Sequence, residues 1–511
     1  MNWIPINEVG AIGVVADQAA FDAPPNALTA AQNVRFNNGY AERVRGEAQY
    51  SNTPLVTPYF LAPHVTPDAR FICHAGISAV YVDDGTTLTD ITGTPPTGAV
   101  ADRWAGCSFS GNLVLTNGVD VPMYWDGDTG NNLATLTGWD TNWRCGSIIG
   151  FGPYLVALGI TKSGVKYPHM YKWSDAADAG SVPASWDEAD ATKLAGERDI
   201  AETADLIVDG APLFETLVVY KERSTWAIRN VGGSDILQHT RLRGDTGLIA
   251  KGCIAQTPVG HVLFVPGDVV LHDGSGPRSI LNGRMRRYLS ANIDATYYAR
   301  SFVVANPKFS EVLVCFPEVG NQVCTQAIVW NWETNALGIR DLNNVTYGCA
   351  GLIPETALDS FDSSSGTFDS DETAFDQDEN NPGETRLLLS TTDPMIRLVD
   401  SGYDYAGTSF TAYIERTGLT FGAEDRVKTI MGVRPDIDAA SGTEVSIEVA
   451  GAMKAGETPS WSAAQTFTVG EDIDCDIFAS GRYVGYRVSS SASTPMRIRN
   501  VSFNVRVGGR F

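Results

Sequence analysis

The stretch NLVLTNGVDVPMYWDGDTGNNLATLT, residues 112–137, contains two short apolar runs separated by a turn. The second run ends in an aromatic pair followed by Asp and Gly, at Tyr124-Trp125-Asp126-Gly127. Residues 71–92 and residues 154–175 repeat this order, and the latter end in Tyr171-Lys172-Trp173-Ser174-Asp175. Short β-branched and aromatic runs bounded by turn residues are typical of strands, so each stretch predicts part of a small antiparallel sheet.

More divergent copies of the same order follow along the chain, at residues 215–230, 260–280, 310–342 and 384–402. About six or seven such units recur, roughly 40–60 residues apart, which is the spacing of β-propeller blades. One blade cannot bury both of its faces alone, so blades stack around an axis and each covers the next. An all-β chain with a propeller of about six or seven blades is therefore predicted. A run of packed β-sandwiches is the alternative.

The two ends of the chain depart from this spacing. Residues 33–44 predict a hairpin, with Asn38-Gly39 able to supply the positive φ angles of a tight turn. After residue 405, strands of alternating polarity predict an additional C-terminal domain resembling a β-sandwich, and in the last of them Ile498 precedes an alternating Val501, Phe503, Val505 and Val507. The predicted divisions are an N-terminal arm and hairpin (1–60), the main part of the propeller (61–355), an acidic strap (356–383), the last propeller strands (384–404) and the sandwich-like domain (405–511). The best short helix candidate is 187–210.

The charge balance of the chain argues against some classes of function. The chain of 511 residues carries 60 Asp and Glu against 37 Lys and Arg, a net charge of −23. Such a balance argues against a protein that grips nucleic acid, because a grip on phosphate needs clustered cations. It is compatible with nucleic acid that passes by without sticking. We expect no membrane-spanning segment, since no apolar run approaches roughly 18 residues. We also expect no signal peptide, since the N-terminus has no basic region followed by a long apolar core. The eight cysteines predict reduced thiols of a cytoplasmic product.

Catalytic motifs are not found in the sequence. It contains no nucleophile elbow, no HExxH zinc motif and no phosphate-binding loop. The six histidines stand singly, and His272-Asp273 lies where other units carry an aromatic residue before Asp, which favours a strand-end residue over a general base. We therefore predict no enzyme activity, no metal site and no cofactor.

Arg284, Arg286 and Arg287 form a basic cluster in this acidic chain. Two interpretations stay open. The arginines lie on a solvated loop and pair with acidic neighbours of the same chain, or they form a subunit contact that receives carboxylates from the next protomer.

Three phenylalanines recur at intervals of seven in the acidic stretch 360–380, at Phe361, Phe368 and Phe375. Each is followed by Asp, and the residues between them are polar or small. A calcium site is one interpretation of the carboxylates, although the stretch lacks the glycine and the flanking helices of an EF-hand. The interpretation that we favour is a strap whose phenylalanines each plug an apolar notch, which contributes roughly 1.5–3 kcal/mol per ring.

Several stretches together resemble the tail nozzle proteins of short-tailed bacteriophages, also called tail tubular protein B. The opening PPNALTAAQNVRFNNGYAERVRGE (24–47) is similar to the family's first hairpin. Residues 244–274 and the two stretches NPKFSEVLVCFPE (306–318) and AIVWNWETNALGIRDL (327–342) are similar to its propeller. The Phe-Asp repeat resembles a Thr-Trp-Asp repeat of the family, with Phe in place of Trp. The ending from residue 480 resembles the family's terminal strands.

This resemblance implies a propeller with an additional β-rich domain, six copies in a ring, and a place in the virion tail below the portal and adaptor. It implies contacts with the head-to-tail adaptor and with tail fibre or needle proteins, synthesis in the bacterial host cytoplasm, and no enzyme activity. Double-stranded DNA would leave through the ring without specific binding, as the negative charge also favours.

Two other functions compete with the nozzle. A glycan-binding or glycan-cleaving propeller of the tail would use Trp125, Trp173 and Trp332 as stacking platforms. The alternative role of these tryptophans is packing between blades, because they recur at equivalent strand ends. A cytoplasmic propeller scaffold that binds peptides is the third possibility.

Overall fold

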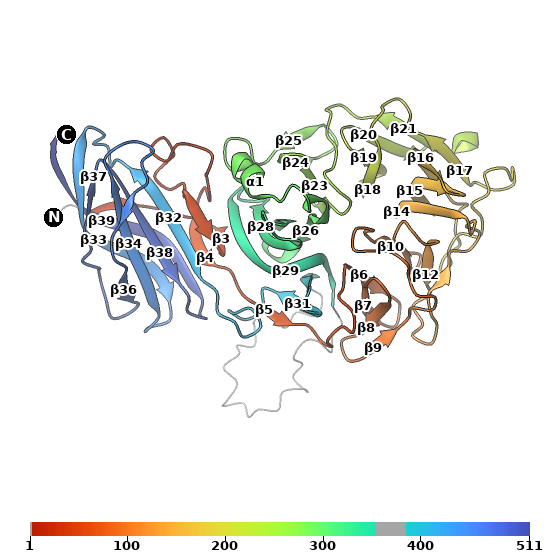
Figure 1. Cartoon of the computed structure of the whole chain (residues 1–511), viewed down its shortest axis with the longest axis horizontal. Coiled ribbons are helices and arrows are strands. Elements are labelled where there is room, and N and C mark those ends of the chain that lie inside the picture. Colours follow the sequence, from red (N-terminus) through yellow and green to blue (C-terminus); the bar gives the residue numbers. More distant parts are fainter. Residues whose placement is uncertain (1–2, 354–384, 511) are drawn as a thin grey trace.

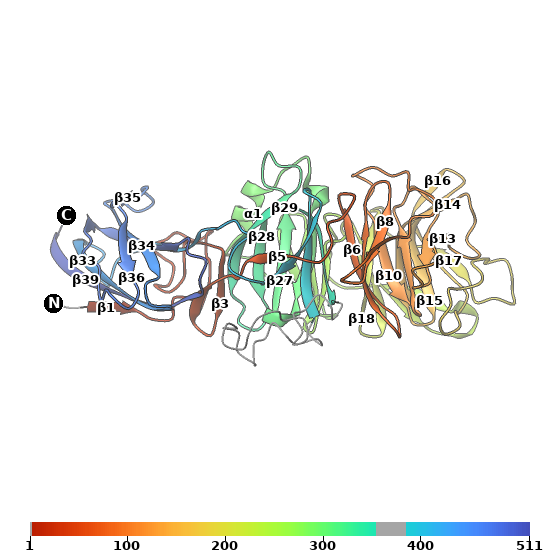
Figure 2. The ribbon, with the colours of Figure 1, turned by 90° about the horizontal axis from the view of Figure 1, so that it is seen from below.

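The computed structural model of the chain describes residues 3–353 and 385–510. Their strands form two β domains, a propeller and a sandwich, which lie side by side along the long axis of the molecule (Figure 1; Figure 2 shows the same pair from below). The predicted all-β class, a propeller with an additional sandwich, is confirmed. The predicted acidic strap, with Phe361, Phe368 and Phe375, lies outside the described residues.

Five four-stranded antiparallel sheets follow one another along the chain as blades 1 to 5. Blades 1 and 2 consist of β6 (Phe60–Val65), β7 (Arg70–Ala75), β8 (Val80–Asp83), β9 (Leu88–Asp90), β10 (Ala105–Phe109), β11 (Asn112–Thr116), β12 (Met123–Trp125) and β13 (Ala134–Thr135). Blades 3 and 4 consist of β14 (Trp143–Phe151), β15 (Tyr154–Lys162), β16 (Val165–Trp173), β17 (Gly196–Asp199), β18 (Ile207–Leu213), β19 (Thr216–Lys221), β20 (Thr225–Asn230) and β21 (Leu237–Arg241). Blade 5 consists of β22 (Ile254–Thr257), β23 (Gly260–Val265), β24 (Asp268–His272) and β25 (Pro277–Ser279). Every residue of β11 and of β23 is buried, because neighbouring blades cover both faces of such a strand.

A single long strand, β29 (Leu337–Leu352), joins the last two blades. Its first part pairs with β28 as far as Val345, and from Val345 onward it pairs with β30. Blade 6 is thus β26 (Phe302–Asn306), β27 (Glu311–Phe316), β28 (Cys324–Asn331) and the start of β29, and blade 7 is the end of β29 with β30 (Thr385–Thr391), β31 (Met395–Val399) and β5 (Glu47–Gln49). The described residues therefore form seven blades.

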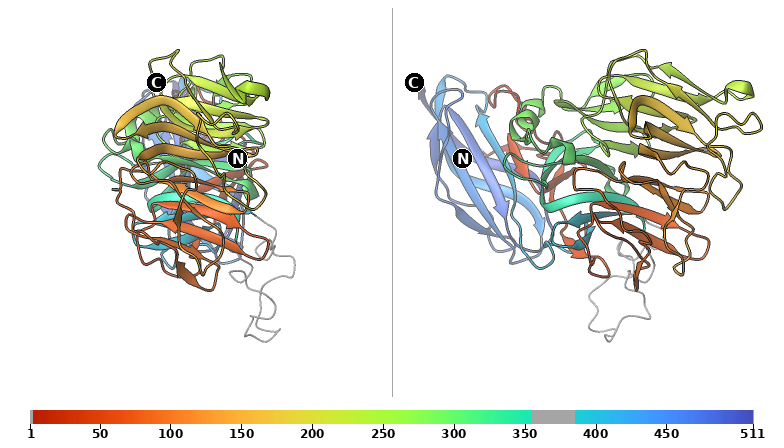
Figure 3. Two further views of the ribbon diagram at one scale, coloured as in Figure 1. Left: turned by 90° about the vertical axis from the view of Figure 1, so that its right-hand side faces the viewer. Right: turned by 45° about the vertical axis from the view of Figure 1, so that its right-hand side comes forward.

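The propeller is closed by a strand from the other end of the chain. β5 precedes blade 1 in sequence but forms the outer strand of blade 7, with Val399 opposite Glu47. Inner strands of successive blades contact one another around the axis, and β29 contacts β6. Figure 3 shows the blades around this axis, with the sandwich standing to one side.

The sandwich is built from both ends of the chain. One sheet contains β1 (Trp3–Ile6), β3 (Val34–Asn37), β4 (Tyr40–Arg43), β33 (Arg426–Ala439), β37 (Ala479–Gly481) and β39 (Met496–Arg510). The other contains β2 (Ala30–Gln32), β32 (Ala412–Leu419), β34 (Glu444–Ala452), β35 (Ser460–Trp461), β36 (Gln465–Thr468) and β38 (Tyr483–Ser490). The predicted hairpin is present, with Asn38 and Gly39 at φ angles of 48° and 82°.

The N-terminal segment 1–60 is not the separate arm that the sequence suggested. β1 and β4 both pair with β39, β2 pairs with β32, and β5 closes the propeller. The physical reason is that long C-terminal strands such as β39 would otherwise present unpaired backbone groups at a sheet edge. The sandwich is therefore not only C-terminal.

The helix candidate at 187–210 is wrong. This segment contains β17 and the start of β18, and Glu188 and Glu197 in it pair with the fully buried ammonium of Lys172. A buried charge needs such partners, and an extended path supplies both. The α-helix of the described chain is α1 (Arg286–Asn292), and three short 3₁₀ turns lie at Gly233–Asp235, Tyr298–Arg300 and Pro307–Phe309.

Histidines lie buried where blades meet. His261 in blade 5 accepts a hydrogen bond of 2.8 Å from the Tyr220 hydroxyl of blade 4 and donates one of 2.9 Å to the Pro212 carbonyl. His272 is fully buried at the end of β24, so the prediction of a strand-end residue is confirmed. His74 is fully buried and stacks on Tyr81, and neither of its ring nitrogens has a hydrogen-bond partner within the described chain.

Burial lowers the pKa of His74 from 6.5 to about 4, so acid should weaken the propeller. A lowered folded-state pKa means that the stabilisation is complete above pH 6.5 and is lost as the pH falls towards 4. Between pH 7.5 and 5.0, His74→Phe should lose about 2 kcal/mol less free energy of unfolding than the unsubstituted chain. Urea titration followed by tryptophan fluorescence measures this, because nine of the eleven tryptophans, all except Trp3 and Trp461, lie in the propeller. Equal pH sensitivity of the two chains would contradict the prediction.

Candidate functional site

A buried charge network joins the sandwich to the propeller. Arg35 on β3 donates two hydrogen bonds to Glu311 on β27, of 2.7 and 2.9 Å, and its Nη2 atom also contacts both oxygens of Asp400, at 3.0 and 3.1 Å. All three side chains are at most 4% exposed. Bidentate guanidinium–carboxylate pairs are the strongest protein hydrogen bonds and fix orientation as well as distance.

The network continues into the strand that closes the propeller. Asp400 also accepts from Arg340, at 3.3 Å, and from the side-chain amide of Asn306, at 2.7 Å. Arg340 lies 3.5 Å from Glu47 on β5, and Arg397 lies 3.7 Å from the other oxygen of Glu47. Three arginines thus face three carboxylates, and the formal charges balance.

The pKa values of the carboxylates in this network shift in different directions. Burial raises the pKa of Asp400, but Arg35 and Arg340 outweigh it and lower that pKa below its ordinary value. For Glu47, burial outweighs Arg340 and Arg397 and raises the pKa. Burial likewise outweighs Arg35 and raises the pKa of Glu311, whereas Asp400 accepts hydrogen bonds from Arg35, Arg340 and Asn306 together.

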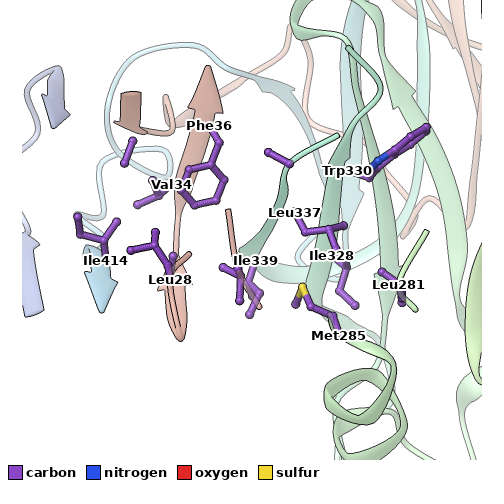
Figure 4. Packing of buried hydrophobic residues seen from close by; sticks show 14 of the residues in the cluster. Leu28, Val34, Phe36, Leu281, Met285, Ile328, Trp330, Leu337, Ile339 and Ile414 are labelled. Atoms are coloured by element: carbon purple, nitrogen blue, oxygen red, sulfur yellow. The ribbon is translucent and has the colours of Figure 1, made fainter. Parts of the chain in front are cut away.

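Apolar packing surrounds the charges. Val34, Arg35 and Phe36 are all buried, so both faces of β3 are covered. Figure 4 shows the cluster that spans the two domains, with Leu28, Val34, Phe36 and Ile414 from the sandwich, and Leu281, Met285, Ile328, Trp330, Leu337 and Ile339 from the propeller. A large apolar contact of this kind opposes the relative motion that is otherwise expected of two domains.

Backbone contacts at Gly13 and Asp17 complete the junction. The amide of Val14 donates to the Leu337 carbonyl, at 2.8 Å. Gly13 next to it has a φ of 79°, and a Cβ atom there would lie 2.5 Å from the same carbonyl oxygen, so only glycine fits. The Asp17 carboxylate accepts hydrogen bonds from the amides of Arg287 and Tyr288 in the first turn of α1, at 2.9 and 3.3 Å. Its negative charge suits the helix N-terminus.

The three arginines of the predicted basic cluster lie at this junction but have different roles. Arg284 donates to the carbonyls of Asn335 and Ile280, at 2.6 and 2.9 Å, and thereby ties blade 5 to blade 6. Arg286 is 47% exposed and pairs with Asp268 at 3.4 Å. The Arg287 side chain is exposed. Arg286 thus fits the interpretation of a solvated arginine that pairs with an acidic neighbour of the same chain. A subunit contact made by the exposed Arg286 and Arg287 stays a prediction.

The tryptophans considered as glycan platforms are packed within the propeller. Trp125 is fully buried, meets Phe71 of blade 1 edge-on at 5.1 Å between ring centroids, and donates to the Asp128 carbonyl at 3.0 Å. Trp173 is 5% exposed and donates to the Leu194 carbonyl at 2.8 Å. Trp332 is half-buried against the main core. Packing between blades is the role that these contacts support.

Sequence reasoning did not find Arg35, Glu311, Asp400 or Arg340. The sequence pattern around Arg35 was a usable signal. Arg35 stands between two apolar residues in a predicted strand, so its side chain must face either solvent or a second part of the protein. The sequence does not tell which.

Residues 3–353 and 385–510 contain no group of three His, Cys, Asp or Glu side chains arranged to hold a metal ion. No helix among them is long and apolar enough to cross a membrane.

Comparison with known proteins finds only solved structures of low similarity. No known protein-family model matches the chain, and no curated protein matches it. Among solved structures, the WD40 domain of Toxoplasma gondii coronin is similar at 9% identity and a TM-score of 0.37, over 76% of this chain and 88% of that one. Apo AztD from Citrobacter koseri is similar at 11% identity and a TM-score of 0.31, over 56% and 86%.

Arg35→Met should lower the free energy of unfolding by about 3–5 kcal/mol, because it leaves Glu311 without its buried partner. Urea unfolding measures the loss. Arg198→Met is the matched control, since Arg198 and Asp235 form an exposed pair and its loss should change stability by no more than about 1 kcal/mol. Adding Glu311→Leu to Arg35→Met should recover part of the loss, and a single substitution as harmless as the control would contradict a structural role for the network.

Trp125→Ala should destabilise the propeller by about 3–5 kcal/mol, because the cavity between blades 1 and 2 cannot collapse fully. Phe214→Ala is the control, since Phe214 is 79% exposed and its removal should change the free energy of unfolding by no more than about 0.5 kcal/mol. Similar effects of the two substitutions in urea titrations would show that Trp125 is not a packing residue.

Proposed function

We propose that this protein is a structural subunit of a tail nozzle of a short-tailed bacteriophage, in which copies of the chain form a ring, six by the family resemblance, around the channel for genome ejection. We propose, from the same resemblance, that the ring belongs to the virion tail, below the head-to-tail adaptor and in contact with tail fibre or needle proteins. Synthesis takes place in the host cytoplasm. No enzyme activity is part of this proposal.

The buried junction between propeller and sandwich is the observation that carries the proposal. A ring of identical subunits closes only if the surfaces that meet are held at a fixed angle within each subunit. The buried network of Arg35, Glu311 and Asp400 and the apolar cluster around Phe36 hold two domains at such an angle. An enzyme that closes around a substrate would instead benefit from a mobile contact.

The charge of the chain supports a passive channel. With a net charge of −23, a wall made of such subunits repels phosphate, so DNA slides without the counterion release that holds it on basic proteins. The glycan-binding alternative loses support, since Trp125 and Trp173 are buried.

Electron microscopy and mass photometry of the purified full chain, alone and with the adaptor protein, test the proposal. Closed rings of one size are expected, together with no retention of double-stranded DNA in gel shifts at about 0.15 M salt, because the net charge of each subunit is −23. A chain that stays monomeric with the adaptor present would overturn the nozzle. Glycan-array binding by the unsubstituted chain would favour the alternative.

A further inference from the structure

One loop of the sandwich presents apolar and acidic side chains to solvent. In the segment Glu471–Phe478 between β36 and β37, Ile473 is 74% exposed and Phe478 is 63% exposed. Glu471, Asp472, Asp474 and Asp476 lie in the same segment, and all four are exposed. Exposed apolar side chains gathered with charges are typical of a contact surface. We call this segment the acidic loop.

The acidic loop is held in place by the sandwich. Cys475 exchanges two backbone hydrogen bonds with Val433 on β33, of 2.9 and 2.8 Å, and Ile477 is only 3% exposed. Cys475 and Ile477 are therefore buried against the sandwich, while Ile473 and Phe478 are exposed. A preformed loop loses little conformational freedom on binding, which favours affinity.

A groove of opposite charge lies on the propeller near the junction. Arg278 and Arg284 line it, with Asn282 and Asn335 at the sides and Trp330 beneath, and none of its lining residues is a carboxylate. The exposed Arg286 and Arg287 follow Arg284 in sequence, at the start of α1. In a chain with 60 carboxylates, a groove free of them stands out. We call these residues the basic edge.

We propose that the acidic loop of one copy of this chain docks on the basic edge of the next copy. This inference rests on the proposed ring. It identifies the two surfaces that meet between neighbouring subunits of that ring. Opposite charges on the two surfaces steer and orient the contact, and Ile473 and Phe478 supply the apolar area.

Contacts between two different surfaces of the same chain are what ring closure requires. The loop adjoins β37 in the sandwich, whereas the basic edge adjoins α1 in the propeller, and the two lie in different domains (Figure 1). Such a head-to-tail contact leaves one free loop and one free edge at the ends of every open oligomer until the ring closes. The rigid junction between the domains then sets the angle of closure.

Charge reversal in two variants of the full chain tests the contact. The edge variant carries Arg286→Glu and Arg287→Glu, and the loop variant carries Glu471→Lys and Asp476→Lys. Each alone places like charges together and should raise the concentration at which half of the chain is assembled at least tenfold. Their equimolar mixture should assemble again, because in an alternating ring every loop meets an edge of opposite charge.

Mass photometry over a range of concentrations and salt measures these outcomes. Arg223→Glu with Arg229→Glu is the matched control, since both arginines are exposed in blade 4 and the change of charge is the same. If assembly is unaffected in both variants, or if the mixture of the two variants fails to assemble, the proposed contact is wrong, but the proposed ring is not contradicted. An unsubstituted chain that stays monomeric overturns the ring and the contact together.

Discussion

The guanidinium of Arg35 belongs to the sandwich, and both of its carboxylate partners belong to the propeller. Separating the domains would leave these charges without partners, and an unpaired buried charge destabilises a protein by several kcal/mol. The apolar cluster of Phe36, Leu337 and their neighbours keeps water away from the pair and makes the contact stronger than the same pair would be at the surface. The relative placement of the two domains follows from this arrangement.

Closure of the propeller depends on the same region. Glu47 lies on β5, the strand that completes blade 7, and its carboxylate faces Arg397 of that blade and Arg340 of blade 6. Arg340 in turn contacts Asp400, which binds Arg35. The short N-terminal stretch from β3 to β5 therefore takes part in both the domain junction and the seventh blade. A subunit that must keep its shape in an assembly gains from this coupling, because closure of the seventh blade and docking of the sandwich on the propeller depend on the same buried side chains.

The distribution of charge separates two roles in this acidic chain. Arginines inside the junction are balanced by buried carboxylates and serve the fold, whereas Arg286, which pairs with Asp268, and Arg287 lie exposed close by. The acidic loop is a surface of the opposite kind, with Ile473 and Phe478 exposed on a segment that is hydrogen-bonded to β33. A ring built from such surfaces would use the rigid junction to turn a local contact into a closed assembly.

The sequence by itself determined the class of structure. The repeated strand, turn, strand order with a terminal aromatic before Asp-Gly predicted the blades, and the Asn38-Gly39 turn predicted the hairpin, because both are properties of neighbouring residues. Only the tertiary structure decided that β5 closes blade 7, that β1 to β4 complete the sandwich, that Arg35 meets Asp400, and that Trp125 is packed between blades. The physical reason is that an alternating pattern states which face of a strand is buried, whereas the segment that buries it lies up to hundreds of residues away and is chosen by pairing and packing.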